Sequence, residues 1–112
     1  MLSSKYRFHS RGGVKYTYQK GKTIRTSKLS LVFALNKRGK QRYAVVISKK
    51  VLKTAVGRNH IRRRLYEAIR LEFNSELKLD CIFVIYSKDF LKMDFQQIRQ
   101  LIRDLLEKAK TE

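Results

Sequence analysis

Three short apolar segments limit this chain to a fold that contains a small β-sheet. Leu29–Leu35 alternates large apolar residues with smaller ones, which places successive side chains on opposite faces of a strand. Tyr43–Ser48 and Cys81–Tyr86 are continuous apolar, β-branched runs, as is typical of strands buried on both faces. The residues between the first two, 36–40, are polar and predict a hairpin turn.

Helical periodicity marks three other segments. Val14–Lys20 predicts a short helix that Gly21 ends, and Arg58–Phe73 predicts a long one. The long helix has an apolar stripe made of Ile61, Leu65, Ala68, Ile69 and Phe73. Its second face carries Asn59, Arg63, Tyr66 and Arg70, with Arg62 at the edge. Asp94 is expected to cap a final helix, with Gln97 at its third position. That helix directs inward Phe95, Ile98, Leu101, Ile102, Leu105, Leu106 and Ala109.

These segments predict one α+β domain with helices packed on a small sheet. A length of 112 residues fits a single domain, and residues 1–11 are expected to be an irregular, basic N-terminus. The strands on either side of the Arg58–Phe73 helix are candidates for parallel pairing, for which the general expectation is a right-handed crossover.

Positive charge is concentrated in the first part of the chain. Residues 1–66 contain nineteen Lys and Arg and no acid, whereas residues 67–112 contain eight Lys and Arg and nine acids. An even solubilising coat would not be so one-sided. A field of this kind attracts polyanions, and because the charge is spread over several elements, nucleic acid is favoured over a membrane surface.

A catalytic site is not apparent in the sequence. The two histidines, His9 and His60, lie in basic surroundings without a nearby acid, and no zinc-ligand spacing or glycine-rich phosphate loop is present. The single cysteine, Cys81, has apolar neighbours and is expected to be a buried thiol, as suits a reducing compartment. No apolar run is long enough for a membrane span or a signal peptide, so a soluble cytoplasmic protein is expected.

Two basic regions are candidates for RNA contact. The first is the strand–loop–helix junction at residues 48–65, where a helix N-terminus adds a favourable dipole for phosphate. The second is the N-terminal region, where Tyr6, Phe8, Tyr16 and Tyr18 alternate with lysines and arginines. Aromatic rings beside cations suit a single strand, although some of these rings could instead belong to the core.

The junction resembles the signature of the bacterial ribonuclease P protein family. The matching residues are Ser48, Lys49, Lys50, Ala55, Val56, Arg58, Asn59, Arg62 and Arg63. The similarity extends from about Lys5 to Lys108 and includes Arg7-Phe8, the 18–22 segment and Asp94. Three positions depart from the family pattern: His60 replaces a common arginine, Gly13-Val14 an acidic–aromatic pair, and Ser87 a commonly basic residue.

The resemblance implies both a fold and a function. The implied fold is α+β, a mostly antiparallel four-stranded sheet with three helices in the order αβββαβα and a left-handed βαβ crossover, which we prefer to the right-handed expectation. The implied function is that of an accessory subunit of ribonuclease P, an endoribonuclease. The protein would bind the catalytic RNA, one protein per RNA, and the 5′ leader of precursor tRNA. The RNA would carry out Mg²⁺-dependent hydrolysis, with no metal site and no catalytic residue on the protein.

The same resemblance assigns two sets of residues. Those expected to bind the catalytic RNA are Lys49, Lys50, Lys53, Arg58, Asn59, Arg62, Arg63 and Arg70. Those expected to bind the leader are Arg7, Phe8, Val14, Lys15 and Tyr18. The main alternative is a ribosomal or general RNA-chaperone protein without a role in tRNA processing, which charge and fold alone do not separate from the first. A reader of double-stranded DNA is less favoured, because no helix-turn-helix spacing is visible.

Overall fold

The computed structural model describes residues 17–35, 41–72 and 79–111, and its elements follow the order expected from the family resemblance. Residues 17–20 are helical, and Gly21 ends this helix with its N–H donating to the carbonyl oxygen of Thr17 at 2.8 Å. The following elements are β1 (Lys22–Arg25), β2 (Leu29–Leu35), β3 (Arg42–Ile47), α2 (Ala55–Glu72), β4 (Leu79–Ile85), the 3₁₀ helix η2 (Lys88–Leu91) and α3 (Phe95–Lys110). The predictions for residues 1–16 and for the turn at 36–40 lie outside the described residues.

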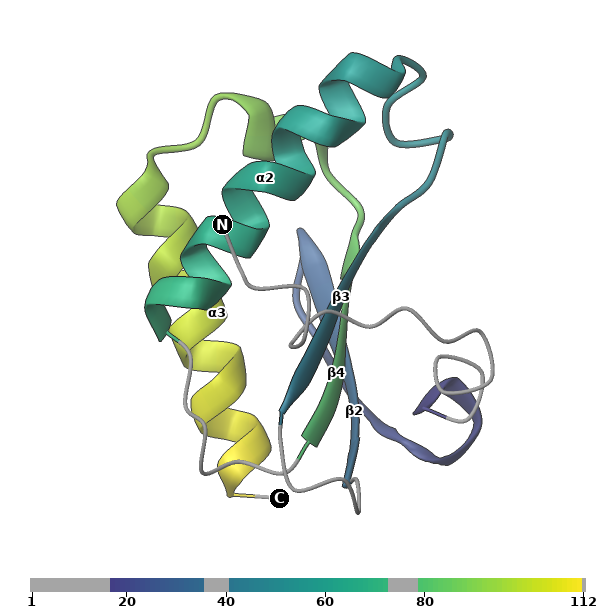
Figure 1. Cartoon of the computed structure of the whole chain (residues 1–112), viewed down its shortest axis with the longest axis vertical. Coiled ribbons are helices and arrows are strands. Elements are labelled where there is room, and N and C mark those ends of the chain that lie inside the picture. Colours follow the sequence, from purple (N-terminus) through teal and green to yellow (C-terminus); the bar gives the residue numbers. More distant parts are fainter. Residues whose placement is uncertain (1–16, 36–40, 73–78, 112) are drawn as a thin grey trace.

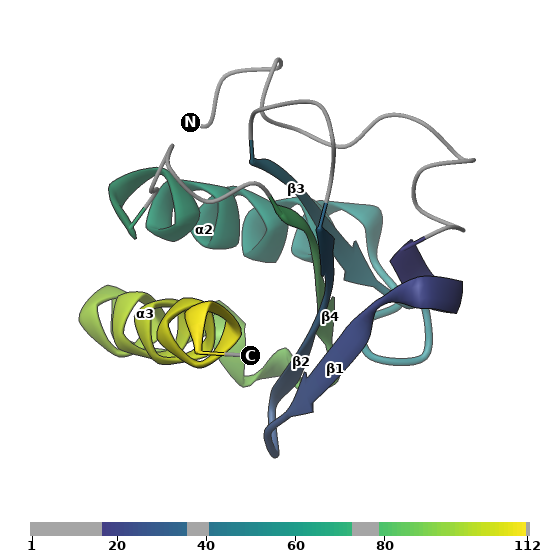
Figure 2. The same cartoon turned by 90° about the horizontal axis from the view of Figure 1, so that it is seen from below.

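The four strands form one mixed sheet in the spatial order β1-β2-β4-β3. β1 pairs with β2 and β2 with β4 in antiparallel fashion, whereas β3 and β4 are parallel. The last strand in the sequence therefore lies between two that precede it. In Figures 1 and 2 the chain passes from β3 through α2 to β4 in a left-handed sense. The general right-handed expectation is wrong here, and the left-handed crossover implied by the resemblance is confirmed.

One edge strand was not evident from periodicity. β1 has the sequence Lys-Thr-Ile-Arg, and Ile24 is its one residue that packs, partly buried, against the core. A four-residue strand at the edge of a sheet needs few apolar residues, because its outer side faces solvent. The sequence pattern therefore predicted three strands, and the fourth came from the family resemblance alone.

Both long helices cover the same face of the sheet, so the molecule has two layers (Figure 2). The core between the layers contains Leu29, Leu31 and Phe33 of β2, alternate residues of β3 and β4, and the apolar stripes of α2 and α3. The stripe predicted for α2 is confirmed at Ile61, Leu65, Ala68 and Ile69, whereas Phe73 lies outside the described residues. Tyr66, which was expected on the basic face, is instead buried in this core.

The ends of the helices are set by short polar side chains. α2 begins three residues earlier than expected, because the Oγ1 of Thr54 accepts a hydrogen bond from the Gly57 N–H at 3.2 Å. A Cβ at Gly57 would overlap the side chains of Leu52 and Thr54, so this close approach favours glycine. Asp94 caps α3 as predicted, with its carboxylate accepting from the Gln96 N–H at 3.0 Å.

A buried ion pair links β3 to β4 on the sheet face opposite to the helices. Arg42 and Asp80 are register partners, and the guanidinium of Arg42 donates from Nε and Nη2 to the two carboxylate oxygens of Asp80, each at 2.8 Å. Such a two-point contact fixes both distance and orientation. On the same face, Val32, Ala44 and Ile82 form a second, smaller apolar cluster. Within the described ranges, neither α2 nor α3 is both long and apolar enough to cross a membrane.

Candidate nucleic-acid interface

The junction between β3 and α2 presents five cations and one amide that we call the junction surface: Lys49, Lys50, Lys53, Asn59, Arg62 and Arg63. Lys49 and Lys50 occupy a turn that is closed by the Val51 N–H donating to the carbonyl oxygen of Ser48 at 3.1 Å. Both lysines and Lys53 are exposed. The turn and the segment that leads from it into α2, in the upper right of Figure 1, therefore carry three exposed lysines.

The exposed face of α2 continues this surface. Asn59 and Arg63 are one helical turn apart and both are exposed. The guanidinium of Arg62 donates to the Oδ1 of Asn59 at 2.9 Å, which orients both side chains on the same stripe of the helix. The bond with Arg62 uses only the Oδ1 of Asn59. The NH₂ group of the same amide can therefore donate to a phosphate or a base.

Arg58 has a different environment from that expected of an RNA ligand. Its Nη1 donates to the carbonyl oxygens of Leu52 at 2.8 Å and of Lys53 at 2.9 Å, and the residue is partly buried. These contacts close the loop between the turn and the helix. Arg58 therefore shapes the segment that displays Lys53, whatever further contact its remaining N–H groups make.

Arg70 lies at the other end of α2. It is twelve residues beyond Arg58, and at ~1.5 Å per residue this places it about 18 Å along the helix axis. Its guanidinium forms an ion pair with Glu67 on the same helix face, and this hydrogen bond lowers the pKa of Glu67. Arg70 is therefore not part of the junction surface, although its side chain is half exposed.

The junction surface carries uncompensated positive charge. In the described part of the chain, the ion pairs of the acids are made with Lys28, Arg42, Arg70, Arg99, Arg103 and Lys110. None of these cations belongs to the junction surface. Its ammonium and guanidinium groups are therefore available to phosphates, and each contact would release condensed counterions.

A second candidate surface lies on the sheet face opposite to the helices. Tyr18 is 46% exposed and Tyr86 is 45% exposed, and the hydroxyl of Tyr86 lies 2.6 Å from the Oγ of Ser30. Partial burial, and to a smaller extent the neighbouring Tyr86, raise the pKa of Tyr18. Val46 of β3 is also exposed on this face. Two aromatic rings and an apolar side chain are thus available for contact with unstacked bases.

Sequence reasoning found only part of this second surface. Tyr86 was expected in a buried strand, but it follows β4 with its ring exposed. Counting by two from Ile82 through Val84 would have placed it on the open face. The other residues assigned to the leader, Arg7, Phe8, Val14 and Lys15, lie outside the described residues, so their relation to Tyr18 remains a prediction.

The described residues contain no group of three or more His, Cys, Asp or Glu side chains that could hold a metal ion. His60 is exposed on α2. The thiol of Cys81 is fully buried, as predicted, and desolvation strongly raises its pKa. What this part of the chain offers is binding groups for a polyanion.

Comparison with known proteins identifies relatives along nearly the whole chain. The family model Ribonuclease P matches residues 2–110. The ribonuclease P protein component of Synechococcus sp. (strain RCC307) is 37% identical over 89 residues, covering 69% of this chain and 70% of the relative. That of Thermoanaerobacter sp. (strain X514) is 33% identical over 97 residues, covering 85% and 81%.

Solved structures show the same fold. The ribonuclease P protein of Staphylococcus aureus superimposes with a TM-score of 0.78 at 25% identity and covers 94% of this chain and 95% of its own. The ribonuclease P protein of Thermotoga maritima has a TM-score of 0.79 at 21% identity, with coverage of 91% and 96%. These likenesses give no support to the alternative of a ribosomal or general RNA-chaperone protein.

Proposed function

The chain belongs to the ribonuclease P protein family, and from this premise we propose that its junction surface binds the RNA of ribonuclease P. The single observation that carries the proposal is the clustering of exposed cations at the β3–α2 junction, without ion-pair partners in the described ranges. Acids lie on α2 itself and on neighbouring elements, yet they pair with other cations. Phosphates are the counter-charges that such a surface fits.

The residues of the junction surface would contact RNA in different ways. Lys49, Lys50 and Lys53 would act as point charges toward phosphates, which gives affinity without sequence preference. Arg63 and the Arg62–Asn59 pair would contact phosphates or exposed base edges with a fixed orientation. Arg58 would hold the loop in place, and Arg70 would make at most a separate contact near the end of α2.

We further propose that the open sheet face binds the 5′ leader of precursor tRNA. Tyr18 and Tyr86 would stack on unpaired bases, beside Val46, and the assignment of Arg7, Phe8, Val14 and Lys15 remains a prediction for the same surface. The leader would therefore contact a surface distinct from that bound by the catalytic RNA. In this scheme one protein assembles with one RNA.

The chemistry would belong to the RNA subunit. The proposal is that Mg²⁺ bound at the RNA activates water for hydrolysis of the phosphodiester, while the protein contributes binding and orientation. A cytoplasmic location, where the transcripts are processed, completes the proposal. Since the described part of the protein brings no candidate nucleophile or metal ligands together, its contribution is expected to be largest when Mg²⁺ is scarce and the RNA needs help to hold its substrate.

Reconstitution tests the proposal directly. The full chain would be combined with a bacterial ribonuclease P RNA, and cleavage of precursor tRNA would be measured at low Mg²⁺. The expected result is cleavage at the leader junction that depends on both components and is lost with the triple variant Lys49→Ala, Lys50→Ala, Lys53→Ala. A matched control is Lys108→Ala and Lys110→Ala on α3. Cleavage that the protein does not stimulate, or an equal loss of cleavage with the triple variant and the control variant, would contradict the role of the junction surface.

A further inference from the structure

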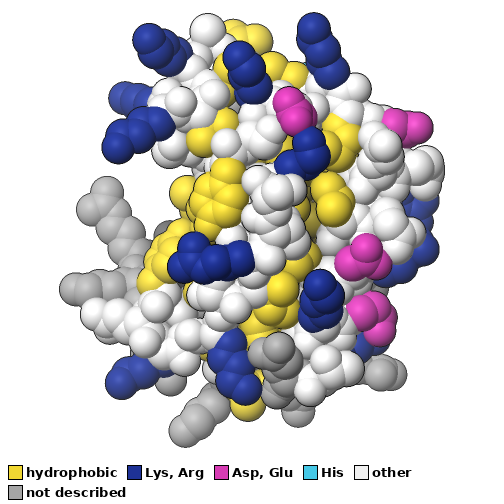
Figure 3. All heavy atoms as spheres, turned by 180° about the vertical axis from the view of Figure 1, so that it is seen from behind, with side chains coloured by type: hydrophobic (Ala, Val, Ile, Leu, Met, Phe, Trp, Pro, Cys, Tyr) yellow, Lys and Arg dark blue, Asp and Glu magenta, His cyan; other side chains and the backbone are white. Residues whose placement is uncertain are grey.

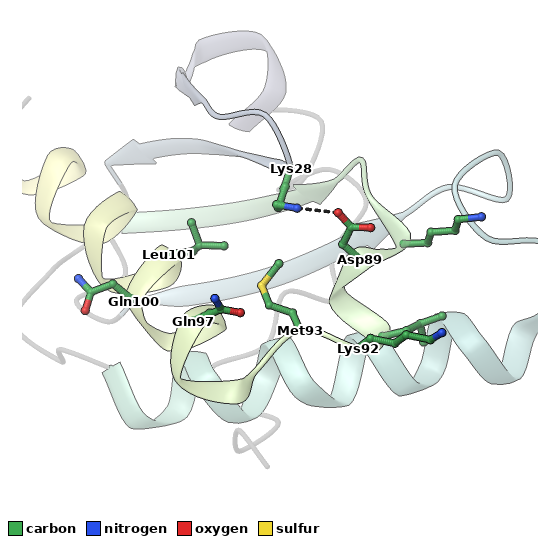
Figure 4. Close-up of a pocket in the computed structure, with 9 residues that line it drawn as sticks. Lys28, Asp89, Lys92, Met93, Gln97, Gln100 and Leu101 are labelled. Atoms are coloured by element: carbon green, nitrogen blue, oxygen red, sulfur yellow. Dashed lines mark hydrogen bonds and ion pairs between the residues drawn. The ribbon is translucent and has the colours of Figure 1, made fainter.

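A cleft distinct from the junction surface has the features of a nucleotide site. One of its lining residues, Lys28, accepts with its carbonyl oxygen a hydrogen bond from the N–H of Tyr86 at 2.9 Å. It lies between the first half of α3, η2 and the turn that precedes β2, and has a volume of about 900 Å³ (Figure 4). The molecular face opposite to that of Figure 1 shows a band of hydrophobic side chains flanked by Lys and Arg (Figure 3). We call this cleft the Met93 cleft.

The floor of the Met93 cleft is apolar and only half buried. Leu91, Met93 and Leu101 line it, and Figure 4 shows Leu101 and Met93 directed into the hollow from α3 and from the segment before it. Methionine is flexible and polarisable, so it adapts to flat rings laid against it. The floor therefore suits the face of a planar, weakly polar group.

The wall formed by η2 is held rigidly. The guanidinium of Arg64, from α2, donates to the carbonyl oxygen of Phe90 at 2.6 Å and also to that of Met93. Phe90 is completely buried beneath this wall. Because these contacts fix the backbone on both sides of Lys92, the cleft is formed before any ligand arrives.

The rim of the cleft is positively charged. Lys28 pairs with Asp89 at 2.6 Å, which ties the turn before β2 to η2 and bounds the cleft on that side. Lys88 and Lys92 also line the rim, and within the described ranges they have no acid as an ion-pair partner. Asp89, the one carboxylate among the described lining residues, is thus neutralised by Lys28, and the ammonium groups of Lys88 and Lys92 remain for an anion.

An amide completes the arrangement. Gln97, in the first turn of α3, lines the cleft and is exposed, and its side chain makes no hydrogen bond to another described residue. An amide offers a donor pair and an acceptor side by side, which matches the edge of a nucleobase. Its neighbour Gln100, by contrast, donates to Asp104 at 2.8 Å.

From this combination we propose that the Met93 cleft binds one unstacked nucleotide of single-stranded RNA. The base lies on Met93 and Leu101, Gln97 contacts its edge, and Lys88 and Lys92 neutralise the adjoining phosphates. A volume of about 900 Å³ falls in the range of small-molecule sites. The Lys28–Asp89 pair bounds the cleft on one side, and the lysines at its rim favour a phosphate-bearing nucleotide over the extended apolar stripe of an amphipathic helix.

The experiment is a titration of the isotope-labelled full chain followed by NMR, with uridine and adenosine 5′-monophosphate as probes. We expect shifts at the Met93 and Leu101 methyl groups and at the Gln97 side-chain amide. Inorganic phosphate alone should leave the methyl groups unchanged. Gln97→Ala should weaken nucleotide binding about fivefold, the effect of one lost hydrogen bond, whereas Gln96→Ala on the same turn should have no effect.

Three outcomes would overturn the proposal: identical shifts with phosphate alone, shifts confined to other surfaces, or shifts with an acidic amphipathic peptide but not with nucleotides. The Met93 cleft and the junction surface consist of different residues, so nucleotide binding at the cleft and RNA binding at the junction surface can each be disproved without the other. Gln97→Ala should bind ribonuclease P RNA through the junction surface as the unchanged chain does. Loss of RNA binding in Lys49→Ala, Lys50→Ala, Lys53→Ala with intact nucleotide shifts would confirm that separation.

Discussion

The guanidinium Nη1 of Arg58 lies 2.8 Å from the backbone carbonyl oxygen of Leu52, six residues earlier in the chain. The same nitrogen reaches the carbonyl of Lys53, so one side chain closes the loop that leads into α2. A residue of the family signature thus has an intramolecular partner at the place where an RNA contact was expected.

Replacing Arg58 by Ala should lower the free energy of unfolding by about 1–2 kcal/mol. The substitution leaves two backbone carbonyls without their charged donor, and part of that loss is recovered because water reaches this partly exposed site. Urea denaturation followed by circular dichroism measures the change. An unchanged midpoint would mean that the guanidinium contributes nothing to the loop and is free for RNA.

Arg63→Ala should behave in the opposite way. Arg63 is exposed and has no ion pair with a described residue, so stability should change by no more than about 0.5 kcal/mol. Its affinity for ribonuclease P RNA should fall by about 1–3 kcal/mol if the contact is bidentate. The slope of log affinity against log salt should also become shallower by about one unit if a phosphate contact is lost. Filter binding across a salt series measures both, and unaltered affinity would remove Arg63 from the interface.

Tyr18→Ala should weaken binding of precursor tRNA by the reconstituted complex, by about 1–3 kcal/mol for one lost stack. Binding of mature tRNA and of ribonuclease P RNA should not change, because Tyr18 lies on the open sheet face. Tyr18→Phe is the matched control, since it keeps the ring and should retain leader affinity. Equal losses for precursor and mature tRNA would show that Tyr18 acts through the fold and not through the leader.

Glu72 should make stability depend on pH. Hydrogen bonds from Arg103 and then Arg99 lower its pKa, with desolvation opposing them. A carboxyl whose folded-state pKa is depressed stabilises the fold above its unfolded pKa, and this contribution disappears as pH falls through the folded value. Glu72→Gln should therefore be less stable than the unchanged chain at pH 7, by about 0.5–1 kcal/mol, and equal to it in acid well below pH 4. Thermal unfolding at several pH values measures the difference, and a constant difference would contradict the assignment.

Periodicity predicted the long elements because their burial patterns are strong. The stripe of α2 and the inward face of α3 follow from helical spacing, and both are confirmed at Ile61, Leu65, Ile98 and Ile102. Periodicity did not predict β1, because an edge strand of four residues buries few apolar side chains. The left-handed crossover could not be derived from local pattern at all, since handedness is a property of packing between distant segments.

The candidate site was predicted by residue type but not by environment. A run of cations at Lys49, Lys50 and Lys53 indicates exposure, because burying unpaired charges is costly. No sequence signal distinguishes Arg58, whose guanidinium bonds its own loop, from Arg63, which forms no ion pair with a described residue. The Met93 cleft was equally invisible, because it brings Lys28 next to Asp89, sixty-one positions later in the chain.

The central position of β4 has a consequence for how this protein acquires its shape during synthesis. β2 and β3 follow one another in the chain, yet they do not pair with each other; each pairs with β4, residues 79–85, which lies between them. Closure of the sheet therefore waits for contacts between segments that are distant along the chain, which slows folding. While the ribosome is still making the C-terminal third, the sheet next to the basic junction is incomplete. Because residues 1–66 carry nineteen Lys and Arg and no acid, the incomplete chain is strongly cationic before its sheet can close, so it attracts any RNA near it by charge alone.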